Sequence, residues 1–117
     1  MEQVYNEKVL KKTDNTLLTE LSLSADCDYF NGHFPQVKIL PAVAQVDIVL
    51  NLASNYLKTP TYVRAAKRLK FTAVIQPEKI CHAEIAYNAE KRSLMFTISS
   101  PEGTIKYSSG TLLFGTV

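Results

Sequence analysis

The sequence of 117 residues has few of the features that mark specialised classes of protein: it has two cysteines, no internal repeat, no low-complexity tract and no Gly/Ser-rich linker. Two thiols are too few for a disulfide framework, and Cys27 and Cys81 lack the paired spacing and companion histidines of a zinc site. We therefore expect both thiols to be reduced and packed, with no bound metal. Without a linker or repeat, the length suits a single domain over residues 1–117 with its own core.

The chain also lacks a strong charge of one sign. It has 13 Lys and Arg against 11 Asp and Glu, which gives a formal net charge of +2 and a sequence pI of about 8.5. This excess is too weak to indicate a nucleic-acid-binding protein, although it leaves an acidic protein partner open. Residues 1–12 carry charges where a signal peptide needs an apolar stretch, and no apolar run is long enough to span a membrane. We expect a cytoplasmic protein.

The order of strand and helix patterns is informative. Residues 16–25 alternate apolar and polar side chains, which predicts a half-buried strand, and residues 3–10 form a weaker strand candidate. Turn-forming residues dominate 26–40, and Pro41 then suits the first turn of a helix over 42–56. Apolar residues cover most of the circumference of this helix, so we expect it to be buried.

After the helix the period returns to two. Alternation predicts strands at 63–73, 81–89 and 94–98, and a last strand at 104–114. In the first of these strands, the pattern places two groups on opposite faces: Val63, Ala65, Lys67, Leu69 and Phe71 on one, and Arg64, Ala66, Arg68 and Lys70 on the other.

Together these elements predict an α+β fold in which an antiparallel sheet of five or six strands wraps around one central helix. One helix cannot cover the edges of such a sheet, and an open edge invites pairing with another chain. A symmetric homodimer would join two edges into one continuous sheet. We therefore expect a homodimer.

Two residues are candidates for proton transfer. His33 stands in a Gly-His-Phe-Pro turn, and Asp47 follows fourteen positions later inside the apolar helix. Histidine titrates near neutral pH and a carboxylate is costly to bury, so both would suit acid–base chemistry if the fold brings them together. The alternatives are a histidine that hydrogen-bonds its own loop and an acid favoured by the helix macrodipole, worth at most about 1 kcal/mol. The macrodipole does not explain why Asp47 has apolar neighbours.

These motifs carry a family resemblance. The element order, the segment Gly32-His33-Phe34-Pro35, the Leu40-Pro41 pair and Asp47 resemble the hot-dog-fold 3-hydroxyacyl-acyl-carrier-protein dehydratases. The resemblance covers the whole chain, because 68–78 is similar to a basic-aromatic strand of the family and 107–110 to its final strand. The short length and the helix start at 41–45 resemble most closely the small dehydratases of aryl polyene gene clusters.

The resemblance implies a dehydratase that needs no cofactor. Its substrate would be a 3-hydroxyacyl thioester on an acyl carrier protein, and its product the trans-2-enoyl thioester of a fatty-acid or aryl-polyene-like pathway. His33 would be the base at the α-carbon. Asp47 would orient or protonate the leaving hydroxyl, reaching the site from the other subunit because family sites lie across the dimer interface.

The thioester oxygen would be bound by backbone N–H groups at the helix start, around Ala42 and Val43, where donors lack intrahelical partners. Here the sequence departs from the family, because Ala42 stands where Gly usually follows the proline. A methyl group would interfere if that position needs positive φ or very close backbone approach, although the N–H donor survives the change.

Other candidate residues have a plain alternative. Phe30 and Phe34 would line an acyl tunnel, or else belong to the core. Arg64, Arg68 and Lys70 would contact an acidic carrier protein, or else form a solvated charged face.

Two other functions remain open on the same fold. A hot-dog acyl thioesterase would use a carboxylate to activate water at the same helix start. A catalytically silent subunit that binds an acyl carrier or forms a heteromer would be consistent with Ala42.

Overall fold

Six strands and one helix follow one another in the predicted order, in a computed structural model that describes residues 5–23, 42–60, 62–75 and 79–115. The elements are β1 (Tyr5–Lys12), β2 (Thr16–Leu23), α1 (Ala42–Leu57), β3 (Val63–Phe71), β4 (Ile80–Asn88), β5 (Ser93–Ser99) and β6 (Lys106–Phe114). Each predicted element is therefore confirmed, with ends that differ by a few residues.

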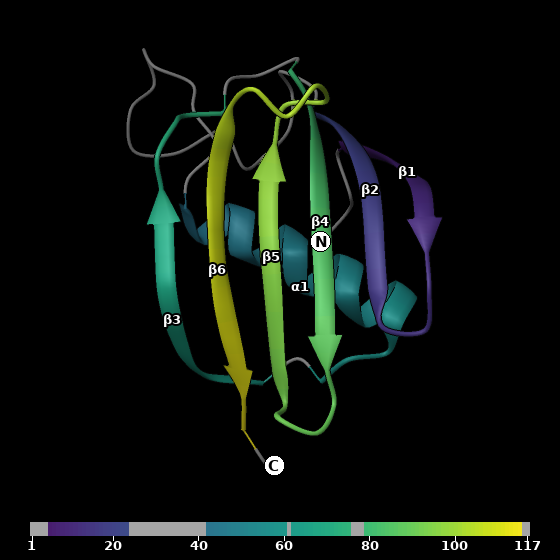
Figure 1. Ribbon diagram of the computed structural model, residues 1–117, viewed down its shortest axis with the longest axis vertical. Helices are drawn as coiled ribbons and strands as arrows, with labels where there is room; N and C mark the ends of the chain where they lie inside the picture. The colour runs from purple at the N-terminus through teal and green to yellow at the C-terminus, as the bar shows by residue number, and fades with distance from the viewer. Residues whose placement is uncertain (1–4, 24–41, 61, 76–78, 116–117) are drawn as a thin grey trace.

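All six strands form one antiparallel sheet in the order β1-β2-β4-β5-β6-β3. The helix crosses one face of this sheet: it begins on the side of β3 and β6 and ends on the side of β2 (Figure 1). We call this the inner face and the opposite one the outer face. The prediction of an α+β fold with an antiparallel sheet around one helix is confirmed.

Alternating side chains of the central strands build the core on the inner face. Strands β4 and β5 alternate buried and more exposed residues along most of their length, as the period-two pattern predicts. The buried side chains of these two strands are Cys81, Ala83, Ile85, Leu94, Phe96 and Ile98. Burial raises the pKa of the Cys81 thiol to about 12, so this thiol is neutral and packed, as expected. Cys27 lies outside the described residues.

The helix is buried or half-buried around most of its circumference. Ile48, Val49 and Leu52 are at most 1% exposed. Val46 and Leu50 are half-buried and pack against the same core. The prediction of a helix buried around most of its circumference is therefore confirmed; among its described side chains, the exposed ones are those of Ala42, Asn51 and Asn55.

Two irregularities in β3 break the simple alternation. Its pairing with β6 shifts between Val63 and Ala65 and again between Lys67 and Lys70. Opposite residues of a pair share a face, so Ala65 and Lys67 lie on the outer face with their β6 partners rather than with Val63. The predicted grouping of Ala65 and Lys67 with Leu69 and Phe71 is wrong. Each extra residue in β3 moves the side chains that follow it to the opposite face of the sheet.

The strands β1 and β3 form the two edges of the sheet. On β3, the large apolar side chains of Leu69 and Phe71 are 41% and 39% exposed. Within the described residues, no helix is both long and apolar enough to cross a lipid bilayer. Those residues also contain no cluster of three or more His, Cys, Asp or Glu side chains that would hold a metal ion.

Candidate active site

The start of α1 supplies backbone donors. The helix begins at Ala42, so the N–H groups of Ala42 and Val43, in its first turn, have no acceptor within the helix. The side chain of Ala42 is exposed. The predicted oxyanion donors at Ala42 and Val43 are therefore in the first turn of the helix, where a ligand oxygen could accept their hydrogen bonds.

The first helical turn is anchored against the sheet by small and polar side chains. Ala44 is 5% exposed and Gln45 is 3% exposed, so both face inward at the end of α1 that lies on the β3 and β6 side (Figure 1). Their burial shows that this side of the first turn is packed, while Ala42 on the same turn is exposed.

Asp47 lies in the second turn of the helix and is half-buried. The first turn contains no acidic residue, so the macrodipole, which acts within the first turn, is a weak explanation for an acid at this position. The next two residues, Ile48 and Val49, are buried against the sheet, whereas Asn51, one turn further along from Asp47, is exposed. The carboxylate thus lies on the flank of the helix, at the border of the core.

A buried hydroxyl on the inner face was missed by the sequence analysis. Ser108 of β6 is 0% exposed, and its Oγ atom has no hydrogen-bond partner among the described residues. It pairs with Phe71 of β3 and Ile98 of β5 and therefore shares their face. Ser108 lies an even number of residues from Leu112 and Phe114, whose apolar side chains face inward. Residues at this spacing in a strand share a face, so the sequence alone could have indicated that Ser108 is buried.

The other predicted site residues separate into two groups. His33, Phe30 and Phe34 lie outside the described residues, so the pairing of His33 with Asp47 and the acyl tunnel remain predictions. Arg68 and Lys70 lie together along a groove on the outer face, and Arg64 lines the hollow next to it.

The comparison with solved structures defines the fold. The chain superimposes with a TM-score of 0.81 and 24% identity on the dehydratase heterocomplex ApeI:P from Xenorhabdus doucetiae, with 97% of each chain covered. An uncharacterized protein from Erwinia carotovora subsp. atroseptica gives a TM-score of 0.72 at 34% identity, over 97% of this chain and 95% of that one. A hypothetical thioesterase with coenzyme A from Streptococcus pneumoniae gives 0.69 at 9% identity, over 92% and 82%. The fold is therefore a hot-dog fold, as the resemblance implied.

The family follows from the sequence. The family model of ApeI-like proteins, described as ApeI dehydratase, matches residues 9–111. The chain belongs to the ApeI-like dehydratase family. A search of curated proteins finds no match. The likeness to the thioesterase is one of fold alone, so family membership, rather than fold, supports elimination of water over hydrolysis.

Proposed function

We propose that this protein dehydrates 3-hydroxyacyl thioesters carried by an acyl carrier protein to trans-2-enoyl thioesters. The pathway would be of the fatty-acid or aryl-polyene type, in the cytoplasm, and the enzyme would need no metal or cofactor. The observation that carries the proposal is the ApeI-like dehydratase match over residues 9–111, which spans His33, the helix start and Asp47.

The reaction divides into three tasks. The base takes the α-proton of the thioester, and the electrons of the broken C–H bond form the new double bond as the β-hydroxyl leaves. His33 would be this base. The N–H groups of Ala42 and Val43 would bind the thioester oxygen while negative charge develops on it. Asp47 would orient the hydroxyl or give it the proton with which it departs as water.

We propose that the active form is a homodimer with its sites at the interface. Leu69 and Phe71 on the edge strand β3 leave apolar surface that a second copy would bury, and Val46 and Leu50, which pack against the core from the flank of α1, are still partly exposed. Asp47 lies next to Val46 on that flank and would thereby reach the partner's site. Because the related Xenorhabdus doucetiae protein was solved as a heterocomplex, light scattering on the purified chain should separate a homodimer from a subunit that needs another protein.

The direct test is formation of the conjugated enoyl thioester, followed by its absorbance. The wild type should convert a 3-hydroxyacyl-carrier substrate, and His33→Ala should lose most of this activity. Asn51→Ala is a matched control, because Asn51 is an exposed polar residue one turn beyond Asp47. The proposal fails if wild type and His33→Ala give equal amounts of product.

The same assay separates the two other candidate functions. Release of free thiol without enoyl product would indicate a thioesterase. Tight binding of the acyl carrier without turnover, unchanged by His33→Ala, would indicate a silent binding subunit.

A further inference from the structure

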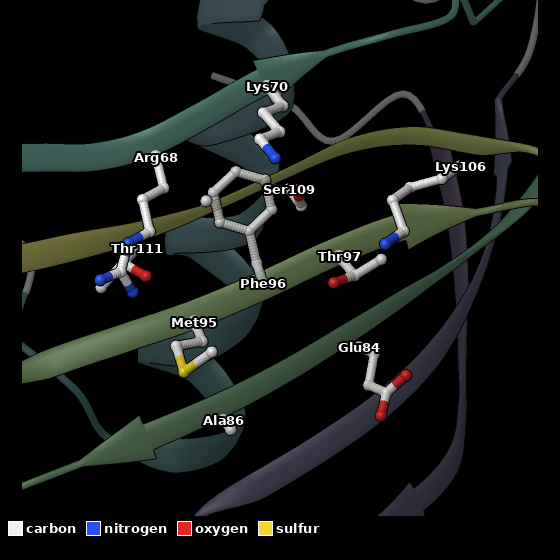
Figure 2. Close-up of a pocket in the computed structure, with 11 residues that line it drawn as sticks. Arg68, Lys70, Glu84, Ala86, Met95, Phe96, Thr97, Lys106, Ser109 and Thr111 are labelled. Carbon is white, nitrogen blue, oxygen red and sulfur yellow. The ribbon is translucent and has the colours of Figure 1, made fainter.

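A cationic groove runs along the outer face of the sheet, opposite α1. One part of it has a volume of about 400 Å³ and is lined from β3, β4, β5 and β6 (Figure 2). A second hollow of about 650 Å³ adjoins it. The two hollows share the four lining residues Arg68, Ala86, Met95 and Thr111, and therefore form one continuous groove.

The groove is strongly unbalanced in charge. Six basic residues line its two parts: Arg64, Lys67, Arg68, Lys70, Lys91 and Lys106. Glu84 is the one acidic residue in this lining. Since the whole chain has nearly equal numbers of basic and acidic residues, the basic excess is local to this surface. Such a surface attracts an acidic partner and raises the rate of encounter.

The irregularity in β3 builds this groove. Arg68 has a φ of 55°, in the left-handed region that a residue with a side chain rarely adopts, and it lies within the register shift between Lys67 and Lys70. A bulge of this kind changes the direction in which a side chain points. Figure 2 shows the result: Arg68 lies above Thr111, while Lys70 lies beside Ser109. The backbone thus places Lys67, Arg68 and Lys70 on the same face, which simple alternation would not.

The groove also has an apolar patch among its cations. Met95 is 59% exposed and, like Ala86, lines both hollows, with polar side chains such as Thr111 beside it. Two aromatic residues line the groove, and they leave little surface on which nucleic-acid bases could stack: Phe96 is 2% exposed, and Tyr87 is half-buried in a T-shaped contact with Phe114. An apolar patch among basic residues is complementary to an amphipathic helix with acidic flanks.

We infer that this groove docks an acidic helix of the acyl carrier protein; the inference rests on the proposed function. It places the carrier on the outer face of the sheet and adds Lys67 and Lys106 to the contacts expected from the sequence. Lys70 directly precedes Phe71, which lies on the inner face with Ser108. The phosphopantetheine arm would therefore pass over the strand ends to the inner face. Its length is about that of five or six extended residues, or roughly 18 Å. The β3 edge remains available for the dimer.

The test compares two substrates of the same acyl group. One is the 3-hydroxyacyl-carrier thioester, and the other is the N-acetylcysteamine thioester, which has no carrier to dock. Lys67→Glu and Lys106→Glu should each raise the ratio of the carrier KM to the truncated-substrate KM about tenfold, because reversing one contact charge costs about 1.4 kcal/mol. Lys8→Glu, an exposed change on the distant strand β1, should leave the ratio within about twofold.

Two results would overturn the docking inference: an unchanged ratio in both groove variants, or an equal rise in Lys8→Glu. Circular dichroism and the melting temperature identify a variant that fails to fold, and Lys67→Gln and Lys106→Gln then replace it with a milder change. If the wild type dehydrates neither substrate, the proposed function has failed. Calorimetric binding of the holo-carrier to the same variants then decides the docking surface on its own.

Discussion

Gly110 of β6 lies directly beneath the side chain of Leu69 on β3. A β-carbon at Gly110 would collide with Cδ2 of Leu69 and lie 3.2 Å from Cε1 of the buried Phe96 ring. Because Gly110 has no side chain, there is room for the irregular part of β3 to pack against β6. The same segment of β3 carries Arg68, which lines the outer groove.

We expect Gly110→Ala to lower the free energy of unfolding by about 1–2 kcal/mol, because overpacking of this kind is destabilising. Leu69→Ala in the same chain should recover part of the loss, since it removes the colliding methyl group. Denaturant unfolding of the two single variants and the double variant measures this coupling. Strict additivity of the two changes would show that the contact does not limit the packing.

A second prediction concerns the attachment of β1 to α1. The Tyr56 hydroxyl on α1 hydrogen-bonds the Glu7 carboxylate on β1, and this bond raises the pKa of Tyr56 above its usual value, with burial adding to the effect. A raised pKa in the folded state means that the bond contributes stability below the tyrosine pKa of the unfolded chain and loses it as the pH rises through the folded pKa.

Glu7→Gln should therefore lower the pKa of Tyr56 and cost about 1 kcal/mol at neutral pH. The difference in phenolate absorbance between wild type and variant, titrated from neutral to alkaline pH, follows this tyrosine among the six in the chain. A titration curve that is identical in the two proteins would rule out the contribution of Glu7.

The third prediction tests the backbone donor at the helix start. Ala42→Pro removes one N–H group, while proline is tolerated in the first turn of a helix. If this N–H binds the thioester oxygen, kcat should fall by roughly 100-fold. Ala42→Gly is the matched control, because it changes the side chain and keeps the donor, and it should retain activity within about tenfold of wild type. Equal kcat values in the proline and glycine variants would show that the donor lies elsewhere.

The strand pattern was predictable from sequence because it is local. Alternation in β4 and β5 and the proline before Ala42 are signals carried by neighbouring residues, and each matched the structure closely. The family resemblance, drawn from the His33 turn and Asp47, agreed with the ApeI-like match.

Features that depend on a distant partner were not predictable. The face on which Ala65 and Lys67 lie is set by where β3 bulges against β6, a strand that is about 40 to 50 positions further along the chain. The outer groove arises from four strands together, so the alternation in residues 63–71 indicated Arg64, Arg68 and Lys70 but could not add Lys106 of β6.

We propose a dehydratase site shared between two copies of the chain, with His33 from one and Asp47 from the other. The most direct measurement is the enoyl absorbance produced by His33→Ala and Asp47→Ala, first separately and then after refolding together in equal amounts. Each variant alone should be nearly inactive. The mixture should recover about a quarter of wild-type activity, because half of the randomly paired dimers are mixed and each has one intact site of two. A mixture no more active than its components, or single variants as active as wild type, would contradict this account.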